Sequence, residues 1–187
     1  ELATDEDVLF MRRKEKTSEY YDKVFSENDN MSRYNNIYKK VGKLVKRKVL
    51  DVGCGTGELS KYIKDYHGFD FSTEAIKIAN SPNTWVGDAY DKKNYGDYDT
   101  YVLTEMLEHT EDLKILANVP KGKQIILSVP SFKDVAHLRT YNEKMVRERY
   151  GKIMKIESIT RFNWKKKWVE GGKETPNYIL LVKAING

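Results

Sequence analysis

The sequence has little cysteine, little proline and no long apolar run, and each shortage excludes a class of protein. A single cysteine, Cys54, can form neither an internal disulfide nor a multi-cysteine zinc site, so a reducing compartment is expected. No apolar run approaches the roughly 20 residues of a membrane-spanning helix. The first residues also lack the basic start and apolar centre of a secretory signal. We therefore expect a cytoplasmic protein without a membrane partner.

A strong charge of one sign is also absent. The chain has 33 basic and 28 acidic residues, a formal net charge of +5, and the bases are scattered along its whole length. This modest excess favours solubility over a dedicated polyanion site, although RNA stays open as a partner. At 187 residues the chain is long enough for one domain with its own core. We expect a single domain, with residues 1–46 as a helical cover and residues 47–187 as an α/β core.

Helical spacing comes first along the chain, and an alternation of strands and helices follows. Apolar residues recur at steps of three and four from Tyr34 to Leu44, and SEYYDKVFSEND predicts a shorter helix ending near residues 28–30. Short strand-like runs then alternate with helical patterns, which predicts a parallel sheet covered on both faces. The expected strands are residues 48–52, 66–70, 85–86, 100–104 and 124–129, and the expected helices are residues 58–65, a helix capped by Ser72, and a helix after residue 104.

The last part of the chain breaks this alternation. After a helix expected around residues 142–150, strand-like runs at 156–163 and 178–184 are separated only by a loop that contains GGKETPN. Strands joined without a crossover helix pair antiparallel. We therefore expect the sheet to close with a hairpin.

A glycine-rich turn follows the first strand, in the segment VLDVGCGTGELS. Gly53, Gly55 and Gly57 permit positive φ and allow a ligand to approach the backbone closely. The dinucleotide fingerprint would require glycine at position 58, which is Glu58. Asp51, just before the turn, would repel a pyrophosphate but attract the ammonium and sulfonium groups of S-adenosylmethionine.

Two further acids end the next two strands. Asp70 follows the second strand, where a carboxylate can accept hydrogen bonds from both hydroxyls of a ribose. Asp88 follows the third strand, where a carboxylate can accept from the amino group of adenine. Either acid alone is more often a cap or a turn residue. Because the carboxyl ends of parallel strands meet at one edge of the sheet, the acids together predict a nucleoside site.

The segments DVGCGTG, GFDFSTEAIKIA, WVGDAY, TEMLEH and ILSVPSF resemble, in this order, the class I S-adenosylmethionine-dependent methyltransferases. The resemblance covers residues 48–130. It implies a Rossmann-like three-layer sandwich with a mostly parallel seven-stranded sheet and an antiparallel last strand, and S-adenosylmethionine as the cofactor. The contacts that it implies are Asp51, Gly53, Gly55 and Gly57 at the methionine moiety, Asp70 at the ribose, Phe71 and Ala89 around the adenine, and Asp88 at its amino group.

The segment TEMLEHT, residues 104–110, follows the fourth strand, close to where the transferred methyl group is expected. Thr104 is assigned to the cofactor site, and Glu105 and His109 are the candidate catalytic residues. Glu105, Glu108 and His109 have the spacing that places side chains on one face of a helix. Methyl transfer is a direct displacement in which positioning supplies much of the acceleration, so a general base is optional.

The same E-x-x-E-H pattern resembles the metal-binding segment of small-RNA 3′-end 2′-O-methyltransferases, and similar residues occur in ubiquinone-pathway O-methyltransferases. The resemblance implies Mg²⁺ or Mn²⁺ held by Glu105, Glu108 and His109, with His137 after the fifth strand as the fourth ligand. Relatives without a metal also carry this pattern, with the histidine as a base or a packing residue. Both alternatives stay open.

Two aromatic groups have alternative interpretations. Tyr20, Tyr21 and Phe25 either roof the cofactor, as N-terminal helices do in the resembled family, or pack in an ordinary way. Trp164 and Trp168, with three lysines between them, either stack on a single-stranded nucleic acid or anchor a solvated loop.

The expected function is methyl transfer to a hydroxyl or an amine of a small molecule or a terminal sugar, since no large cap domain is inserted. Ribose 2′-O-methylation of RNA with a divalent metal is the alternative, because the N/D-P-P-Y/F signature of base methylation is missing. A non-catalytic partner subunit that binds S-adenosylmethionine is the third hypothesis.

Overall fold

Within residues 14–27 and 31–187, which the computed structural model describes, the chain forms one eight-stranded sheet. The strands are β1 Val49–Val52, β2 Tyr66–Asp70, β3 Thr84–Val86, β4 Thr100–Leu103, β5 Gln124–Pro130, β6 Met154–Trp164, β7 Trp168–Glu170 and β8 Tyr178–Asn186. Their order is β3-β2-β1-β4-β5-β8-β6-β7. The first five pair in parallel, whereas β8 pairs antiparallel with both β5 and β6. The mostly parallel sheet with an antiparallel end is thereby confirmed.

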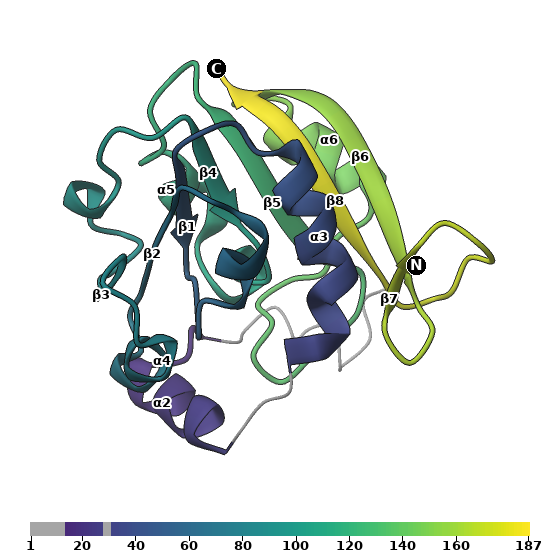
Figure 1. Cartoon of the computed structure of the whole chain (residues 1–187). Coiled ribbons are helices and arrows are strands. Elements are labelled where there is room, and N and C mark those ends of the chain that lie inside the picture. Colours follow the sequence, from purple (N-terminus) through teal and green to yellow (C-terminus); the bar gives the residue numbers. More distant parts are fainter. Residues whose placement is uncertain (1–13, 28–30) are drawn as a thin grey trace.

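Helices cover both faces of this sheet (Figure 1). The α-helices are α2 Ser18–Ser26, α3 Asn35–Leu44, α4 Thr73–Ala79, α5 Asp112–Leu116 and α6 Glu143–Tyr150, and the short 3₁₀ helices are η1 Met31–Tyr34, η2 Glu58–Tyr62, η3 Lys92–Asn94 and η4 Leu107–His109. α3 lies over one face, and α5 and α6 lie over the other. No helix in the described part of the chain is long and apolar enough to cross a membrane.

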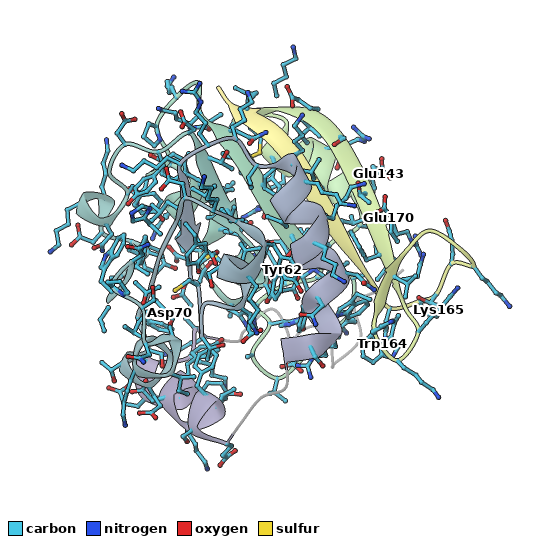
Figure 2. The ribbon with its side chains drawn as sticks, viewed as in Figure 1. Tyr62, Asp70, Glu143, Trp164, Lys165 and Glu170 are labelled. Carbon is cyan, nitrogen blue, oxygen red and sulfur yellow. The ribbon has the colours of Figure 1, made fainter. Side chains whose placement is uncertain are left out.

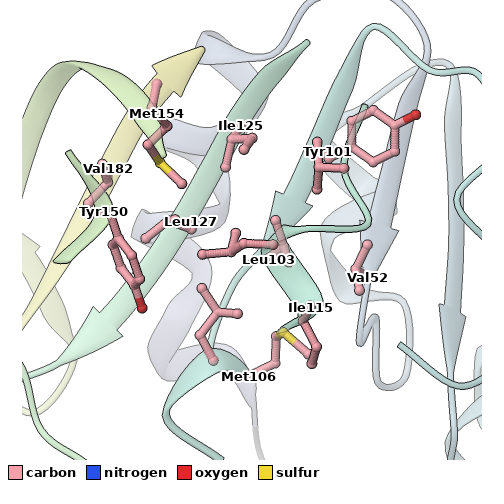
Figure 3. Close-up of a cluster of buried hydrophobic side chains, with 14 of the residues drawn as sticks. Val52, Tyr101, Leu103, Met106, Ile115, Ile125, Leu127, Tyr150, Met154 and Val182 are labelled. Atoms are coloured by element: carbon pink, nitrogen blue, oxygen red, sulfur yellow. The ribbon is translucent and has the colours of Figure 1, made fainter. Parts of the chain in front are cut away.

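Successive residues of the central strands enter two separate hydrophobic cores. Side chains alternate between the faces of a strand, so neighbouring positions pack on opposite sides of the sheet. On the α3 side the core contains Ile37 and Val41 of the helix against Val102 and Ile126 of the sheet. The core on the other side is shown in Figure 3, where side chains of the sheet strands meet those of α5 and α6; among them are Leu103, Leu127, Val182, Ile115 and Tyr150.

The helix α2 is held over the carboxyl ends of the parallel strands. Thr17 caps it by accepting a hydrogen bond from the backbone N–H of Tyr20. Asp22 of α2 then accepts from the Ser72 hydroxyl and from the backbone N–H of Glu74, at the start of α4. Figure 1 shows the two helices side by side at this edge. This contact brings the aromatic side chains of α2 over the ends of β1 and β2.

Four predicted features differ from the structure. The helix expected at 58–65 is only the 3₁₀ helix η2, and the segment after β4 is η4 followed by the short α5. The final hairpin is confirmed, but it carries the additional strand β7, which makes eight strands instead of seven. The helix expected to end near residues 28–30 ends at Ser26. Residues 28–30 lie outside the described ranges, as do residues 1–13, the first part of the expected helical cover.

Candidate active site

One pocket at the carboxyl ends of β1, β2 and β4 gathers most of the residues predicted for the cofactor and for catalysis. They are Asp51, Gly53, Gly55, Asp70, Phe71, Asp88, Ala89, Thr104, Glu105 and His109. Gly57 is not part of this lining, because it faces the other side of the turn, toward Ala79. Glu108 and His137 line a second pocket that adjoins the first. We call the first the cofactor pocket and the second the acceptor-side pocket.

The glycine-rich turn has the backbone that glycine alone adopts easily. Gly53, Gly55 and Gly57 have φ values of 72°, 51° and 76°. The turn is tied to β2, because the backbone N–H groups of Gly53 and Cys54 both donate to the Phe69 carbonyl at 2.9 Å. A Cβ on Gly55 would lie 3.3 Å from the ring of Phe25. The turn therefore presents bare backbone to the cofactor pocket.

Asp51 is the buried acid beneath this turn, with only 3% of its surface exposed. Its Oδ2 accepts from the Tyr66 hydroxyl at 2.8 Å, and its Oδ1 has no hydrogen-bond partner among the described residues. Burial raises the pKa of Asp51 to about 7, although the Tyr66 hydrogen bond opposes the rise. Burial removes the water that would stabilise an ionised carboxylate. A cationic ligand would therefore stabilise the charged form of Asp51.

Tyr66 is the hydrogen-bond partner of Asp51, and the sequence pattern did not reveal it. It stands at the start of β2, and its hydroxyl passes over Gly68 to reach Asp51. A Cβ on Gly68 would come within 2.9 Å of that hydroxyl and within 2.8 Å of the Cys54 Cβ. The glycine in the middle of a buried strand was the available signal, because it marks a close approach.

Asp70 and Asp88 differ in burial and in what they already hold. Asp70 is buried, and it accepts from the backbone N–H groups of Gly55 and Ser72, both at 2.9 Å. Burial raises its pKa, and these two hydrogen bonds oppose the rise. Asp88 is exposed and accepts from the backbone N–H of Tyr90 at 2.8 Å. Both acids therefore stabilise the turns in which they lie. Each also lines the cofactor pocket and has further lone pairs that could accept a hydrogen bond from a ligand.

Aromatic side chains from α2 cover the cofactor pocket. The Tyr21 ring lies 5.4 Å from the ring of Phe71 and 5.9 Å from that of His109, measured between centroids. Phe25 lines the same pocket, whereas Tyr20 lines only the acceptor-side pocket. The Tyr21 hydroxyl is buried without a hydrogen-bond partner among the described residues. Of the three aromatics considered in the sequence, two thus contact the cofactor pocket.

The expectation that Glu105, Glu108 and His109 share one helical face is wrong. Glu105 has a φ of 54°, in the left-handed region, so no helix runs through it. Its backbone N–H donates to the Ser128 hydroxyl at 3.0 Å, and that hydroxyl donates to its carboxylate at 2.6 Å. This double contact with β5 turns Glu105 toward the boundary of the two pockets, because it lines both. Burial, and then the neighbouring Glu108, raise the pKa of Glu105 to about 8.

Glu108, His109 and His137 form a separate group whose potential ligand atoms all lie within 4.8 Å of one another. His109 Nδ1 is 3.0 Å from the Ala136 carbonyl, and His137 Nδ1 is 2.9 Å from a neighbouring carbonyl. A carbonyl can only accept, so in the neutral rings Nδ1 carries the hydrogen and Nε2 the lone pair. Glu108 is 1% exposed, and its Oε2 has no hydrogen-bond partner among the described residues.

The chemistry of this group fits a divalent cation. A carboxylate and two imidazoles oriented by carbonyl hydrogen bonds are a usual ligand set with its supporting contacts. Glu105 is not part of the group, so the predicted ligand set of Glu105, Glu108, His109 and His137 is reduced to the last three. Burial raises the pKa of Glu108 to about 8 and lowers the pKa of His109. Burial is the main cause of both shifts, and at Glu108 the charge of Arg139 opposes it only in part.

Comparisons with known proteins give a consistent result. Residues 13–166, more than half of the chain, match the protein family described as "Methyltransferase domain". A ubiquinone biosynthesis O-methyltransferase of Photorhabdus laumondii subsp. laumondii is 35% identical over 97 residues, a match that covers 44% of this chain and 40% of that protein. An uncharacterized protein of Methanocaldococcus jannaschii is 36% identical over 78 residues, 30% of its length. The chain thus spans less than half the length of the curated relatives it matches.

Solved structures share the fold at low sequence identity. The structure described for the conversion of a disulfide bond into a thioacetal group during echinomycin biosynthesis has a TM-score of 0.67 and 15% identity, covering 91% of this chain and 93% of that one. The N-methyltransferase NodS from Bradyrhizobium japonicum, in complex with S-adenosyl-L-homocysteine, has a TM-score of 0.63 and 13% identity, covering 91% and 99%.

Proposed function

The chain belongs to the methyltransferase domain family, within the S-adenosylmethionine-dependent class I enzymes, and we propose that it methylates a hydroxyl or an amine of a small molecule or a terminal sugar. The observation that carries the proposal is Asp51, a buried carboxylate with one unpartnered oxygen beneath a bare glycine turn. An acid in this position attracts a cationic sulfonium nucleoside and repels the phosphates of a dinucleotide. The O-methyltransferase and N-methyltransferase names of its relatives agree with either acceptor atom.

In this proposal the cofactor lies along the ends of three strands. The methionine moiety meets Asp51 and the glycine turn, and the ribose hydroxyls donate to Asp70. The adenine is placed by the remaining predicted contacts, which line the same pocket; these are Phe71, Asp88 and Ala89. Thr104, at the end of β4, lies beside the position that the arrangement leaves for the methyl group.

Glu105 and His109 are the proposed catalytic residues because they line both pockets, where acceptor and cofactor would meet. The acceptor lone pair forms a bond to the methyl carbon while the carbon–sulfur bond breaks and its electron pair goes to sulfur. The acceptor's proton leaves to a carboxylate or to water. Holding the acceptor in line with the methyl group supplies much of the acceleration.

Calorimetric titration with S-adenosyl-L-homocysteine tests the proposal directly. The wild type is expected to bind it, and Asp51→Asn to bind it about ten- to a hundredfold more weakly, because a charge-assisted contact is worth about 1.5–3 kcal/mol. Asp97→Asn is the matched control, since Asp97 is exposed and pairs with Lys123 away from the site. Binding of NADH without binding of S-adenosyl-L-homocysteine would overturn the assignment.

A divalent cation such as Mg²⁺ or Mn²⁺ is the second proposal, and the convergence of Glu108, His109 and His137 supports it. These residues would hold the ion, which supplies a lower pKa for an acceptor hydroxyl. This set would also suit the alternative acceptor, the ribose 2′-hydroxyl of RNA. Titration of the metal-free protein with each ion should release heat in the wild type and none in Glu108→Gln. An absence of heat in the wild type would remove the metal.

Turnover separates the remaining alternatives. A panel of catechols, amines, sugars and RNA 3′ ends would show methyl transfer by an enzyme and none by a non-catalytic binding subunit. RNA binding would also weaken steeply with salt, because phosphate contacts release counterions.

A further inference from the structure

We propose that the acceptor-side pocket binds an aromatic amine, a planar ring that carries a protonated amino group, as the methyl acceptor. This inference rests on the proposed methyl transfer and names the substrate class for the same site. The pocket adjoins the cofactor pocket, with which it shares Tyr21, Phe25, Glu105 and His109. An acceptor seated there would therefore reach the cofactor along Glu105 and His109.

The outer wall of this pocket is a row of aromatic rings. Phe132 stacks on Trp168 with centroids 5.5 Å apart and planes 13° apart, and Trp164 follows at 4.8 Å from Trp168. Trp168 is buried with 3% exposure and fixes the row in the core on the α3 side of the sheet. Trp164 is 38% exposed and lies beside the loop that follows β6 (Figure 2). Its open surface suits a planar ring or a cation.

Three buried polar groups of the lining have no hydrogen-bond partner among residues 14–27 and 31–187. They are Glu108 Oε2, the Tyr21 hydroxyl and Trp168 Nε1. Buried polar atoms are nearly always paired in native proteins, so the Glu108 oxygen and the Tyr21 hydroxyl indicate a ligand that donates to them, whereas the Trp168 N–H can only donate and is not paired by an ammonium. In the metal-free protein, an ammonium group would supply the donors that the Glu108 carboxylate requires.

The lining of this pocket offers a cationic acceptor more partners than it offers an anionic one. Among the described residues that line this pocket, the side chains that can carry a charge are Glu105, Glu108, Asp134, Arg33, His109 and His137. Three carboxyl groups offer oxygens to an ammonium, whereas an anionic acceptor such as a carboxylate or a phosphate would find a single guanidinium. The three lysines between Trp164 and Trp168 do not line the pocket, so they do not reverse this balance.

The transfer step balances for an amine. The ammonium first loses one proton to solvent, which leaves a neutral amine with a lone pair. That lone pair forms the nitrogen–carbon bond as the carbon–sulfur bond breaks, and its electron pair stays on sulfur. The products are the methylated ammonium and S-adenosyl-L-homocysteine, whose sulfur is no longer charged, and the proton released in the first step stays in solvent.

A matched set of probes tests the inference in the presence of chelator and saturating S-adenosyl-L-homocysteine. The set is 2-phenylethylamine, 2-phenylethanol, phenylacetate and 2-cyclohexylethylamine, which differ in charge or in ring planarity. Binding is followed by the indole N–H signals in NMR spectra. The amine should bind at least about tenfold more tightly than phenylacetate, a difference of about 1.4 kcal/mol. It should also bind more tightly than the alcohol and the cyclohexyl amine.

Variants of the wall sharpen the test. Trp164→Ala should weaken 2-phenylethylamine about five- to thirtyfold, because a cation over an indole ring is worth about 1–2 kcal/mol. Lys173→Ala, an exposed residue of the loop between β7 and β8, is the matched control and should bind like the wild type. Unchanged binding of S-adenosyl-L-homocysteine by Trp164→Ala would show that the variant is folded.

Two outcomes would overturn the inference. One is phenylacetate binding as tightly as the amine, and the other is unchanged amine binding by Trp164→Ala. If S-adenosyl-L-homocysteine binds and no amine does, the acceptor assignment is wrong while the proposed methyl transfer stands. If S-adenosyl-L-homocysteine itself does not bind, the proposed methyl transfer fails first.

Discussion

Glu108 and Asp112 are two buried carboxylates four residues apart, in the segment that follows β4, yet their surroundings are opposite. Asp112 has no exposed surface and accepts from Arg149 at 2.7 Å and 2.9 Å, from Tyr141 at 2.9 Å and from Tyr150 at 2.8 Å. Glu108 has one oxygen 3.6 Å from His109 Nε2 and another without a hydrogen-bond partner among the described residues. The first carboxylate is satisfied within the fold, and the second is left open toward a pocket.

The difference separates an acid that stabilises the fold from one that is proposed to bind a ligand. Burial by itself would raise the pKa of Asp112, but the Arg149 hydrogen bonds and then those of the tyrosines hold it below its usual value. At Glu108 a backbone hydrogen bond and the charge of Arg139 oppose burial only in part, so its pKa rises to about 8. A buried acid without compensation costs stability. The protein tolerates that cost at Glu108, where a ligand is proposed, and avoids it at Asp112, where α5 meets α6.

Replacing Asp112, the fully hydrogen-bonded acid, should have the largest effect on stability. Asp112→Asn leaves Arg149 without its carboxylate in a largely buried network, and removal of one partner of a buried pair costs about 3–5 kcal/mol. Urea unfolding followed by circular dichroism measures the loss. Asp97→Asn, at an exposed ion pair, should not change the midpoint measurably. Equal effects of the two substitutions would show that Asp112 has no special structural role.

Replacing Glu108, the acid with one unpartnered oxygen, should leave stability nearly unchanged and lower turnover. Glu108→Gln replaces a buried carboxyl group, whose pKa is about 8, by a neutral amide of the same size, so the free energy of unfolding should stay within about 0.5 kcal/mol of the wild type or increase. Its turnover should fall at least about tenfold, the range expected when a ligand-holding or proton-transferring group is lost. Urea unfolding and initial rates on the same preparations test both statements. A large loss of stability with normal turnover would make Glu108 a second structural acid.

Asp51 stands between these extremes, with one oxygen partnered and one open, and it should titrate near neutrality. Tyr66, Asp70 and Cys54 are the titratable groups beside it. Because its pKa is about 7, affinity for S-adenosyl-L-homocysteine should fall by up to tenfold per pH unit below 7, as the acid becomes neutral. Calorimetry between about pH 5.5 and pH 7 measures the slope, and Asp51→Asn should flatten it. A wild-type profile without slope would contradict the role of Asp51.

The unliganded protein should show the opposite pH trend in stability. The folded pKa of Asp51 lies above its unfolded value, so the folded state binds more protons between about pH 4 and pH 7. Its contribution to stability is therefore complete at the acidic end and is lost as the pH rises through the folded pKa. Cofactor affinity and unliganded stability should consequently move in opposite directions over the same interval.

Much of the fold follows from local patterns. The alternation of strands and helices, the glycine turn and the helixless GGKETPN connection predict the parallel sheet with its antiparallel end, because each depends on neighbouring residues. β7 was not predicted, since three residues at a sheet edge leave no periodic signal. The acids at the ends of β1 and β2 could be proposed as cofactor contacts once the sheet was predicted, because the carboxyl ends of parallel strands lie at one edge of the sheet.

The contacts that distinguish the acids could not be predicted. The left-handed backbone of Glu105 is held by Ser128 on another strand, and this separates Glu105 from Glu108 and His109 despite their helical spacing. The aromatic wall depends on a hairpin that places Trp164 beside a pocket formed much earlier in the chain. Long-range geometry of this kind overrides local spacing.

Removing the hydrogen bond that Asp51 accepts from Tyr66 should make Asp51 resemble Glu108, at a small cost in stability. Tyr66→Phe deletes the hydrogen bond to Oδ2 and should cost about 1 kcal/mol of stability at about pH 8. The loss should be smaller near pH 5, because the hydroxyl stabilises the ionised carboxylate and Asp51 is then mostly protonated. Urea unfolding at both pH values measures the difference, and Tyr62→Phe is a control on a partly exposed tyrosine of η2. A cost independent of pH would mean that Tyr66 stabilises the fold by packing alone, and Asp51 would then be open on both oxygens.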